Sequence, residues 1–470
     1  MSVLLLEFNE LSPRLMDRFI ADGQLPNFKK LKAESATYIT DAGEVPPNLE
    51  PWIQWVTVHT GLPFAEHKCF HLNDGASLSA RRIWDHVGAS GGKSWVCGSM
   101  NASFDDTVFE GHFLPDPWAS DVPDFPCNYF KAFNDVVRPF VQEHSGKPKV
   151  SALEMVKFGK FMAENGLSAA TVQATISQLL SERRKPSKWR RALILDRLQW
   201  DLFCGIYRRE KPRFASFFIN STAHFQHFHW RELEPDLFDI KPSGADLETY
   251  GDAILDGYRN MDRIIGDALK LAAPGTAIVL CTALSQQPML TYEHNEGRQI
   301  FRHRDIEALL AFAGVSEKCV YSPVMSQEFH LHCDSNVDAA NVASKLEKIV
   351  LCDGSQVMWA YPIESKVNAG CMLSKDPGEQ LLHTGDSAPA AFRDFFYPLE
   401  SLRSGMHDPE GIFWVKASGI QPGSAADMSV PLLCVYPTIA ELLGISLKTP
   451  YARSVLKAEE YLEYQDNAAA

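Results

Sequence analysis

The sequence predicts an α/β protein with a doubly wound, mostly parallel sheet. Apolar runs of strand length recur along the chain and are separated by amphipathic helical segments, which is the order typical of such sheets. A strand at 213–219, a helix at 250–271 and a strand at 276–282 form a βαβ unit, whose crossover we expect to be right-handed. We therefore predict a single α/β domain over residues 1–470, with a helical insertion or cap at 128–211.

The elements of the main domain are predicted in order along the chain. Residues 3–8 form an apolar run that indicates a central strand, and Ser12-Pro13 can cap the helix predicted at 14–22. The other predicted elements are helices at 25–32, 52–60 and 437–443 and strands at 93–99 and 412–417.

The residue composition of the predicted insertion differs from that of the rest of the chain. It is polar and amphipathic, with few strand signals. Residues 168–184 and 190–209 both repeat apolar side chains at three- and four-residue spacing, which indicates helices. We interpret this segment as a cap on the main domain and not as a separately folding unit.

Composition limits the class of protein. A net charge of −14 argues against a nucleic-acid partner, which needs a basic surface. No run reaches the ~18 apolar residues that a membrane-spanning helix requires, so we expect no membrane span. The chain opens without the features of a secretory signal, and its ten cysteines are scattered with no CxxC pair. Reduced thiols in a cytoplasmic protein are the simplest interpretation.

A histidine-rich stretch follows the strand predicted at 213–219. Asn220 and the two hydroxyl residues after it resemble a helix N-cap, and in such a helix His224 and His227 share a face while His229 does not. Polar groups just past the carboxyl end of a central strand lie where open α/β sheets bind ligands. One histidine here would more often be a packing residue, but three within six residues favour a functional site.

Six motifs in sequence order point to a known family. They lie at residues 4–11, 25–31, 58–67, 222–230, 404–413 and 437–445. Together they resemble the alkaline phosphatase superfamily, in its type I phosphodiesterase and nucleotide pyrophosphatase branch, over most of the chain outside the insertion. The resemblance implies an alkaline phosphatase-like fold and a small-molecule substrate that contains a phosphate ester or a related phosphodiester, sulfate or phosphonate.

The chain differs from this family at the positions that bind metal ions and supply the nucleophile. Family members typically hold two divalent metal ions with aspartates and histidines, beside a Ser or Thr nucleophile. Here Asn9 takes the place of the first aspartate, Ala223 that of another, and residues 283–285 replace an Asp-His-Gly motif. The nucleophile's place falls near Glu50, and no hydroxyl side chain occurs from 46 to 56. We therefore do not expect the standard two-zinc site.

The polar residues that remain predict a rebuilt, non-standard site with a degenerate metal and nucleophile set. The candidates are Glu7, Glu50 and His224 as catalytic residues, Asn9, Asn48 and His67 as substrate-binding residues, and His227 and His407, which match family metal positions, as candidate metal ligands. Two histidines and a carboxylate could bind one divalent ion, Zn or Mn, or could act as general base and acid without a metal.

Three hypotheses about function remain open from the sequence. The first is a hydrolase or transferase that acts on a phosphate ester or related small molecule. The second is a catalytically inactive pseudoenzyme that binds a phosphorylated ligand or a protein partner in the same cleft. In the third, function lies in the insertion. The polar side chains retained in the cleft favour the first, and neither the substrate nor the oligomeric state is specified.

Overall fold

The main body of the protein is built on one eight-stranded mixed sheet. The computed structural model describes residues 1–119, 121–142, 150–384, 388–423, 427–447 and 449–456. In spatial order the strands are β19 (Met428–Pro431), β2 (Ala36–Asp41), β18 (Glu410–Lys416), β6 (Ala277–Cys281), β1 (Val3–Phe8), β5 (Phe214–Ile219), β3 (Ser94–Cys97) and β4 (Gly111–Leu114). Only β18 runs antiparallel to its neighbours among these strands. The predicted α/β class with a mostly parallel sheet is confirmed.

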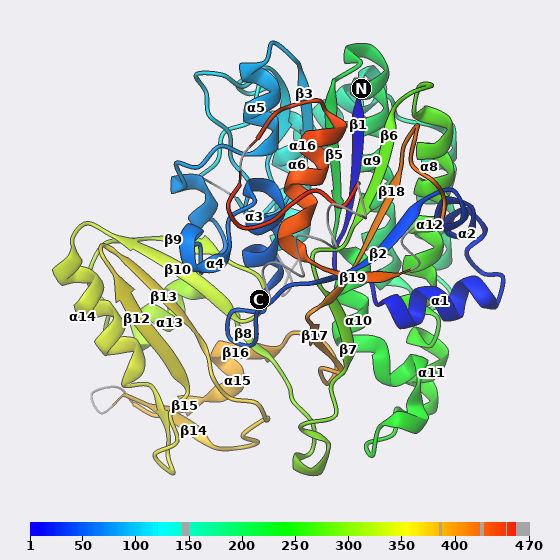
Figure 1. Cartoon of the computed structure of the whole chain (residues 1–470). Helices are drawn as coiled ribbons and strands as arrows, with labels where there is room; N and C mark the ends of the chain where they lie inside the picture. The colour runs from blue at the N-terminus through cyan, green and yellow to red at the C-terminus, as the bar shows by residue number, and fades with distance from the viewer. Residues whose placement is uncertain (120, 143–149, 385–387, 424–426, 448, 457–470) are drawn as a thin grey trace, which may run out of the picture.

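Helices cover both faces of this sheet (Figure 1). Alternate residues of β1 point to opposite faces, as in any strand, and enter two separate hydrophobic cores. One core includes α9 (Arg191–Glu210) and α12 (Ala253–Leu271), and the other includes α3 (Pro51–Thr60) and α16 (Val435–Leu442). Burial on both faces explains why β1 is apolar along nearly all its length.

The predicted βαβ unit is present, with β1 inserted between its two strands. β5 and β6 each pair in parallel with β1, in a register that aligns Leu5 with Ser216 and Val279. Between them the chain forms α10 (Ser221–Leu233), α11 (Gly244–Tyr250) and α12. The carboxyl ends of β1, β5 and β6 therefore lie side by side, and the segments that follow them share one edge of the sheet.

The first two helices begin by different means. α1 (Pro13–Ala21) has Ser12 at its N-cap position, but the Ser12 side chain does not form the predicted capping hydrogen bond. α2 (Pro26–Ala33) is capped from another helix, because the Asp262 carboxylate of α12 accepts hydrogen bonds from the backbone N–H groups of Asn27 and Phe28. These contacts hold the N-terminal helices against the core that carries β1.

The predicted insertion is helical in its described part. It contains α6 (Lys131–Gln142), α7 (Ala152–Glu164), α8 (Ala169–Ser181) and α9, while residues 143–149 lie outside the described residues. The buried face of α9 packs into the main core against β5 and β3. That this segment is an insertion within a single domain stays a prediction. So does the extent of that domain at its C-terminal end, because residues 457–470 also lie outside the described residues.

A second lobe, residues 301–398, has a hydrophobic core of its own. Its four-stranded antiparallel sheet has the order β12 (Met358–Ile363), β13 (Lys366–Cys371), β10 (Glu328–Cys333) and β9 (Cys319–Pro323). α14 (Asn336–Glu347) packs on this sheet, and the lobe projects from one side of the main body in Figure 1. None of the described helices is both long and apolar enough to cross a membrane.

We expect His303, in the second lobe, to make stability depend on pH. It ends β8 (Phe301–His303) and is 7% exposed, with its ring centroid 4.8 Å from that of Phe329. Burial lowers the pKa of His303 from 6.5 to about 3. As the pH falls below 6.5, His303 therefore becomes protonated in the unfolded chain but stays neutral in the folded chain. This histidine therefore costs stability in acid, where His303→Phe should unfold less readily than the parent.

The measurement is urea unfolding of both proteins at several pH values between about 7.5 and 4.5. The slope of unfolding free energy against pH should be smaller in His303→Phe by up to one proton, which is about 1.4 kcal/mol per pH unit. Equal slopes in the two proteins would show that His303 titrates alike in the folded and unfolded chains.

Candidate active site

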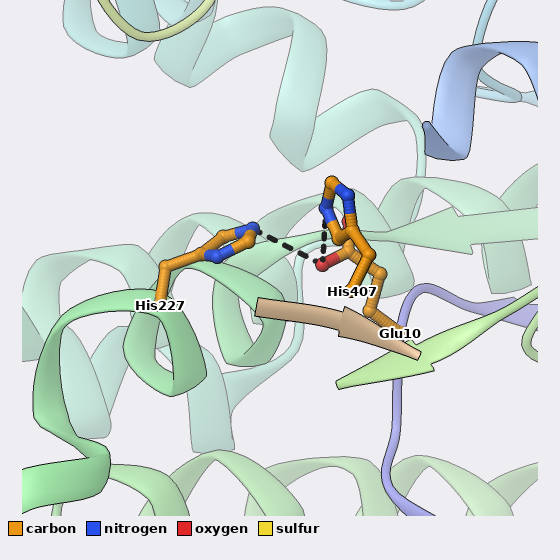
Figure 2. A group of neighbouring side chains, drawn as sticks. All are labelled: Glu10, His227 and His407. Carbon is orange, nitrogen blue, oxygen red and sulfur yellow. Dashed lines mark ion pairs between the residues drawn. The ribbon is translucent and has the colours of Figure 1, made fainter. Parts of the chain in front are cut away.

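Three side chains from distant segments meet at the carboxyl edge of the main sheet. Figure 2 shows Glu10, His227 and His407 pointing toward one another. Glu10 Oε2 lies 3.2 Å from His227 Nε2 and 3.5 Å from His407 Nε2. Glu10 follows β1, His227 lies on α10 after β5, and His407 lies on β17 (Gly405–Asp408). We call these three residues the Glu-His-His cluster.

The backbone at Glu10 turns its side chain into the cluster. Its φ of +61° lies in the left-handed region, which residues other than glycine rarely adopt and which is common at functional sites. The Glu10 carboxylate accepts a hydrogen bond from Asn9 Nδ2 at 2.8 Å and another from Gln286 Nε2. Gln286 lies on β7 (Ser285–Pro288), directly opposite His407 in the β7–β17 pair. The carboxylate is therefore held in place from two sides.

Asn9 serves as a buried link in this arrangement. Its Oδ1 accepts a hydrogen bond from Trp55 Nε1 at 2.8 Å, and its Nδ2 also donates to Asn220 Oδ1 at 2.7 Å. The side-chain amide of Asn9 thus connects the ends of β1 and β5 and orients the Glu10 carboxylate. Its carbonyl oxygen already accepts the hydrogen bond from Trp55.

The two imidazoles differ in how their tautomers are set. His407 Nδ1 lies 2.9 Å from the carbonyl oxygen of Leu49, to which it can only donate, so in the neutral ring Nε2 carries the lone pair. That Nε2 atom is buried and has no hydrogen-bond partner. His227 Nδ1 lies 3.3 Å from the Gly405 carbonyl oxygen and 3.2 Å from Arg403 Nη2. Donation from Nδ1 to Gly405 leaves a lone pair on Nε2, whereas a hydrogen bond from Arg403 to Nδ1 places the proton on Nε2.

The cluster fits one divalent metal ion. It offers a carboxylate oxygen and two imidazole nitrogens, all within 4.8 Å of one another, which is a donor set found at catalytic zinc sites. Ligand atoms placed tetrahedrally at the usual metal distances are ~3.4 Å apart, close to the two distances from Glu10. The buried Nε2 of His407, which forms no hydrogen bond and lies 3.5 Å from Glu10 Oε2, is the atom that such an ion would bind.

Burial and neighbouring charges set the protonation of the cluster. Burial alone would raise the pKa of Glu10, but His407 and His227 outweigh it and hold the pKa well below its usual value. Burial, with Arg403 adding to it, lowers the pKa of His227 to about 4, so this ring is neutral at neutral pH. Burial opposes protonation of His407, yet Glu50 and Glu10 raise its pKa above 6.5. A metal ion would have to displace that proton.

Glu50 is the second carboxylate at the cluster. It stands at the N-cap position of α3 but does not cap its own helix, and its Oε2 lies 3.5 Å from His407 Nδ1. Burial raises the pKa of Glu50, while His407, Arg403 and Arg298 act in the opposite direction. An ionised carboxylate with a raised pKa suits a general base.

The structure places the other predicted site residues with different partners. Glu7 is fully buried in β1, where its carboxylate binds His59 Nε2 at 2.9 Å and the Ser99 hydroxyl at 2.6 Å. His224 Nε2 lies 3.5 Å from Glu400 Oε1, at the partly exposed side of α10. Both therefore have partners other than the Glu-His-His cluster.

The remaining two predicted residues flank α3: Asn48 lies in the loop before it, and His67 ends the short helix α4 (Phe64–His67) after it. Asn48 Nδ2 donates to Glu44 at 3.2 Å, and the next residue supplies the carbonyl that orients His407. His67 Nε2 lies 3.3 Å from the Thr57 hydroxyl, and burial lowers the pKa of His67 to about 4. Of the eight predicted residues, His227 and His407 belong to the Glu-His-His cluster, and Asn9 and Glu50 lie next to it.

Sequence reasoning missed three residues of the site, Glu10, Gln286 and Arg403. Glu10 is adjacent to Asn9 just past the first strand, and Arg403 directly precedes the motif at 404–413, so position along the chain was the available signal. Gln286 follows the segment 283–285 that differs from the family pattern. Its place opposite His407 depends on a strand pairing that the sequence does not reveal.

The sequence matches no family model and no curated protein. Solved structures that the chain matches over nearly its whole length include human ectonucleotide pyrophosphatase/phosphodiesterase 5, with 12% identity, a TM-score of 0.44 and coverage of 98% of this chain and 99% of that one. The murine enzyme matches with 10% identity, a TM-score of 0.42 and coverage of 98% and 100%.

A phosphonoacetate hydrolase from Sinorhizobium meliloti 1021, solved with phosphonoformate, matches with 11% identity and a TM-score of 0.40, over 94% of this chain and 95% of that one. Identities this low and TM-scores below 0.5 say nothing of this chain's chemistry.

Proposed function

We propose that this protein is a hydrolase of a phosphate ester or a related phosphodiester, sulfate or phosphonate, and that it uses a single divalent metal ion. The observation that carries the proposal is the Glu-His-His cluster, in which the buried His407 Nε2 forms no hydrogen bond and lies 3.5 Å from Glu10 Oε2. Glu10, His227 and His407 would hold the ion, Zn or Mn. When bound, the ion would polarise a phosphoryl oxygen as a Lewis acid and stabilise the charge that develops there.

The charges around the cluster suit an anionic substrate. Glu10 and Glu50 contribute two negative charges, and the half-buried Arg403 contributes one positive charge. With a divalent ion and neutral histidines, the net charge of these groups is +1. This positive charge attracts a phosphate ester, which the two carboxylates alone would repel. Arg403 lies beside His227 and can donate to a substrate oxygen when His227 Nδ1–H donates its hydrogen bond to the Gly405 carbonyl oxygen.

Glu50 would act as the general base. It occupies the place near which the family resemblance puts a nucleophile, but a carboxylate there can accept a proton from an attacking water molecule. No Ser or Thr occurs from 46 to 56, so the nucleophile in this proposal is a water molecule. The reaction is then a direct hydrolysis with no covalent enzyme intermediate.

Removal of the metal tests this function. Treatment with a chelator followed by dialysis should lower kcat/KM on the best substrate by on the order of a hundredfold or more, and one equivalent of Zn or Mn should restore it. The substrate panel is para-nitrophenyl phosphate, bis-para-nitrophenyl phosphate, para-nitrophenyl sulfate and para-nitrophenyl phenylphosphonate, with release of nitrophenolate as the readout.

Two results would overturn the proposal in different ways. Full activity after chelation would mean that the histidines and carboxylates act without a metal. Binding of a phosphate ester without turnover of any panel member would favour the inactive binding protein.

A further inference from the structure

A cavity of about 320 Å³ lies between the chain before β8 and the second lobe. It is lined from the chain before β8 by Tyr292 and Arg298, and from the second lobe by Gln327, Trp359 and Met372. The backbone N–H of Arg403 donates to the carbonyl oxygen of Arg298 at 2.8 Å, which joins the wall of the cavity to Arg403, the neighbour of His227. The charge of Arg298 also acts on Glu50 and Arg403.

Arg298 gives the cavity a cationic wall. Its side chain is half-buried, with the guanidinium carbon 5.5 Å from the centroid of the Tyr292 ring, and it forms no ion pair with any residue in the described ranges. A guanidinium held on an aromatic ring and left without a carboxylate partner is well placed to bind an anionic group of a ligand.

Trp359 gives the cavity a flat apolar wall. Its ring lies close over Gly370 of the neighbouring strand β13, where a Cβ atom would be 2.7 Å from Cζ2 of the indole. It also stacks on Tyr361, two residues along the same strand, with ring centroids 5.1 Å apart and an angle of 23° between the planes. The indole is half-buried and held by these two neighbours, and the part that lines the cavity can offer ordered apolar surface to a planar group.

We propose that this cavity binds the organic part of the substrate, and that this part combines a planar or apolar body, held against Trp359, with a second anionic group, held by Arg298. The proposal rests on the proposed function, because the phosphate ester would occupy the neighbouring Glu-His-His cluster. It narrows the substrate class to esters that carry an acidic substituent away from the scissile bond. The second lobe then supplies specificity to chemistry performed by the main body.

A pair of synthetic esters tests the subsite. Phenyl phosphate and para-carboxyphenyl phosphate share the reacting group and the ring and differ in the added carboxylate. We expect the parent protein to prefer para-carboxyphenyl phosphate in kcat/KM by about tenfold to a hundredfold, the effect of one charge-assisted hydrogen bond. Arg298→Met should abolish this preference, and Trp359→Ala should weaken turnover of both esters alike.

Arg304→Met is the matched control. Arg304 also lies over a tyrosine ring, 5.5 Å from the centroid of Tyr397, but it does not line the cavity. This variant should keep the preference for the carboxylated ester. Calorimetric binding of both esters to metal-loaded protein gives a second readout that does not require turnover.

The outcomes separate this inference from the proposed function. Hydrolysis of both esters without a preference, or a preference that survives in Arg298→Met, would overturn the subsite and leave the hydrolase intact. Selective binding of the carboxylated ester without any hydrolysis would support the subsite and overturn the hydrolase. Absence of both binding and hydrolysis would overturn both.

Discussion

Replacing His227 by Ala should remove the bound metal and lower kcat/KM by on the order of a hundredfold or more, while the protein stays folded. The His227 side chain contributes one of three donor atoms, and its Nε2 lies 3.2 Å from Glu10 Oε2. Without it, the carboxylate and His407 would bind an ion too weakly to keep it through purification. Elemental analysis, steady-state kinetics and circular dichroism of the purified variant measure the three effects.

His224→Ala is the matched control for this prediction. His224 lies one helical turn earlier on α10 and faces Glu400 rather than the cluster. We expect this variant to keep its metal and most of its activity. A large loss of activity in His224→Ala with the metal retained would restore the catalytic role that the sequence suggested for His224. Retained metal in His227→Ala would remove His227 from the ligand set.

Glu50→Gln should lower kcat by about a hundredfold to ten-thousandfold and leave the metal content unchanged, as expected for loss of a general base. The amide keeps the shape of the side chain but cannot accept a proton. Because burial raises the pKa of Glu50, the activity of the parent should fall on the acid side at a pH above the usual carboxylate value of 4.5, where Glu50 becomes protonated. The pH profile of the variant should lack that limb.

Glu44→Gln provides the control for Glu50. Glu44 lies on the same loop before α3 and accepts a hydrogen bond from Asn48, away from His407. Its replacement should leave kcat and the pH profile unchanged. If Glu50→Gln instead lost the metal together with its activity, Glu50 would be a ligand and another group would have to serve as the base.

The sequence is sufficient to place the edge of the sheet that carries the site. β1 and β5 are apolar over at least five residues and end in polar segments, and such runs predict buried parallel strands whatever the rest of the chain does. The ends of parallel strands share one edge, so the strand pattern by itself predicts that Asn9 and His227 lie near one another. His407 and Glu50 are added by motif order alone.

The remaining part of the site depends on geometry that local sequence does not encode. Glu10 enters the cluster because its backbone adopts a left-handed conformation, and its N–H donates to the carbonyl oxygen of Thr282, the residue that follows β6. Gln286 reaches the site through long-range pairing of β7 with β17. Helical spacing predicts a shared face for His224 and His227, but it does not determine that His227 meets Glu10 while His224 lies near Glu400.

The separate core of the second lobe was also not predicted. Several of its strands are short and only partly buried, and in β9 and β12 exposed positions interrupt the alternation that identifies a strand. The sheet is antiparallel and built from residues close in sequence, so its order follows from hairpin pairing and not from a βαβ pattern. The cavity beside the active site arises only where this lobe meets the chain before β8.

The most direct test of the account is the metal content of the purified native protein, prepared without a histidine tag so that only its own ligands bind. Inductively coupled plasma mass spectrometry, with protein concentration from amino-acid analysis, gives the number of ions per chain. We expect about one Zn or Mn ion per chain, held by Glu10, His227 and His407. Two ions per chain, or none after purification and after incubation with either metal, would contradict the single-metal site.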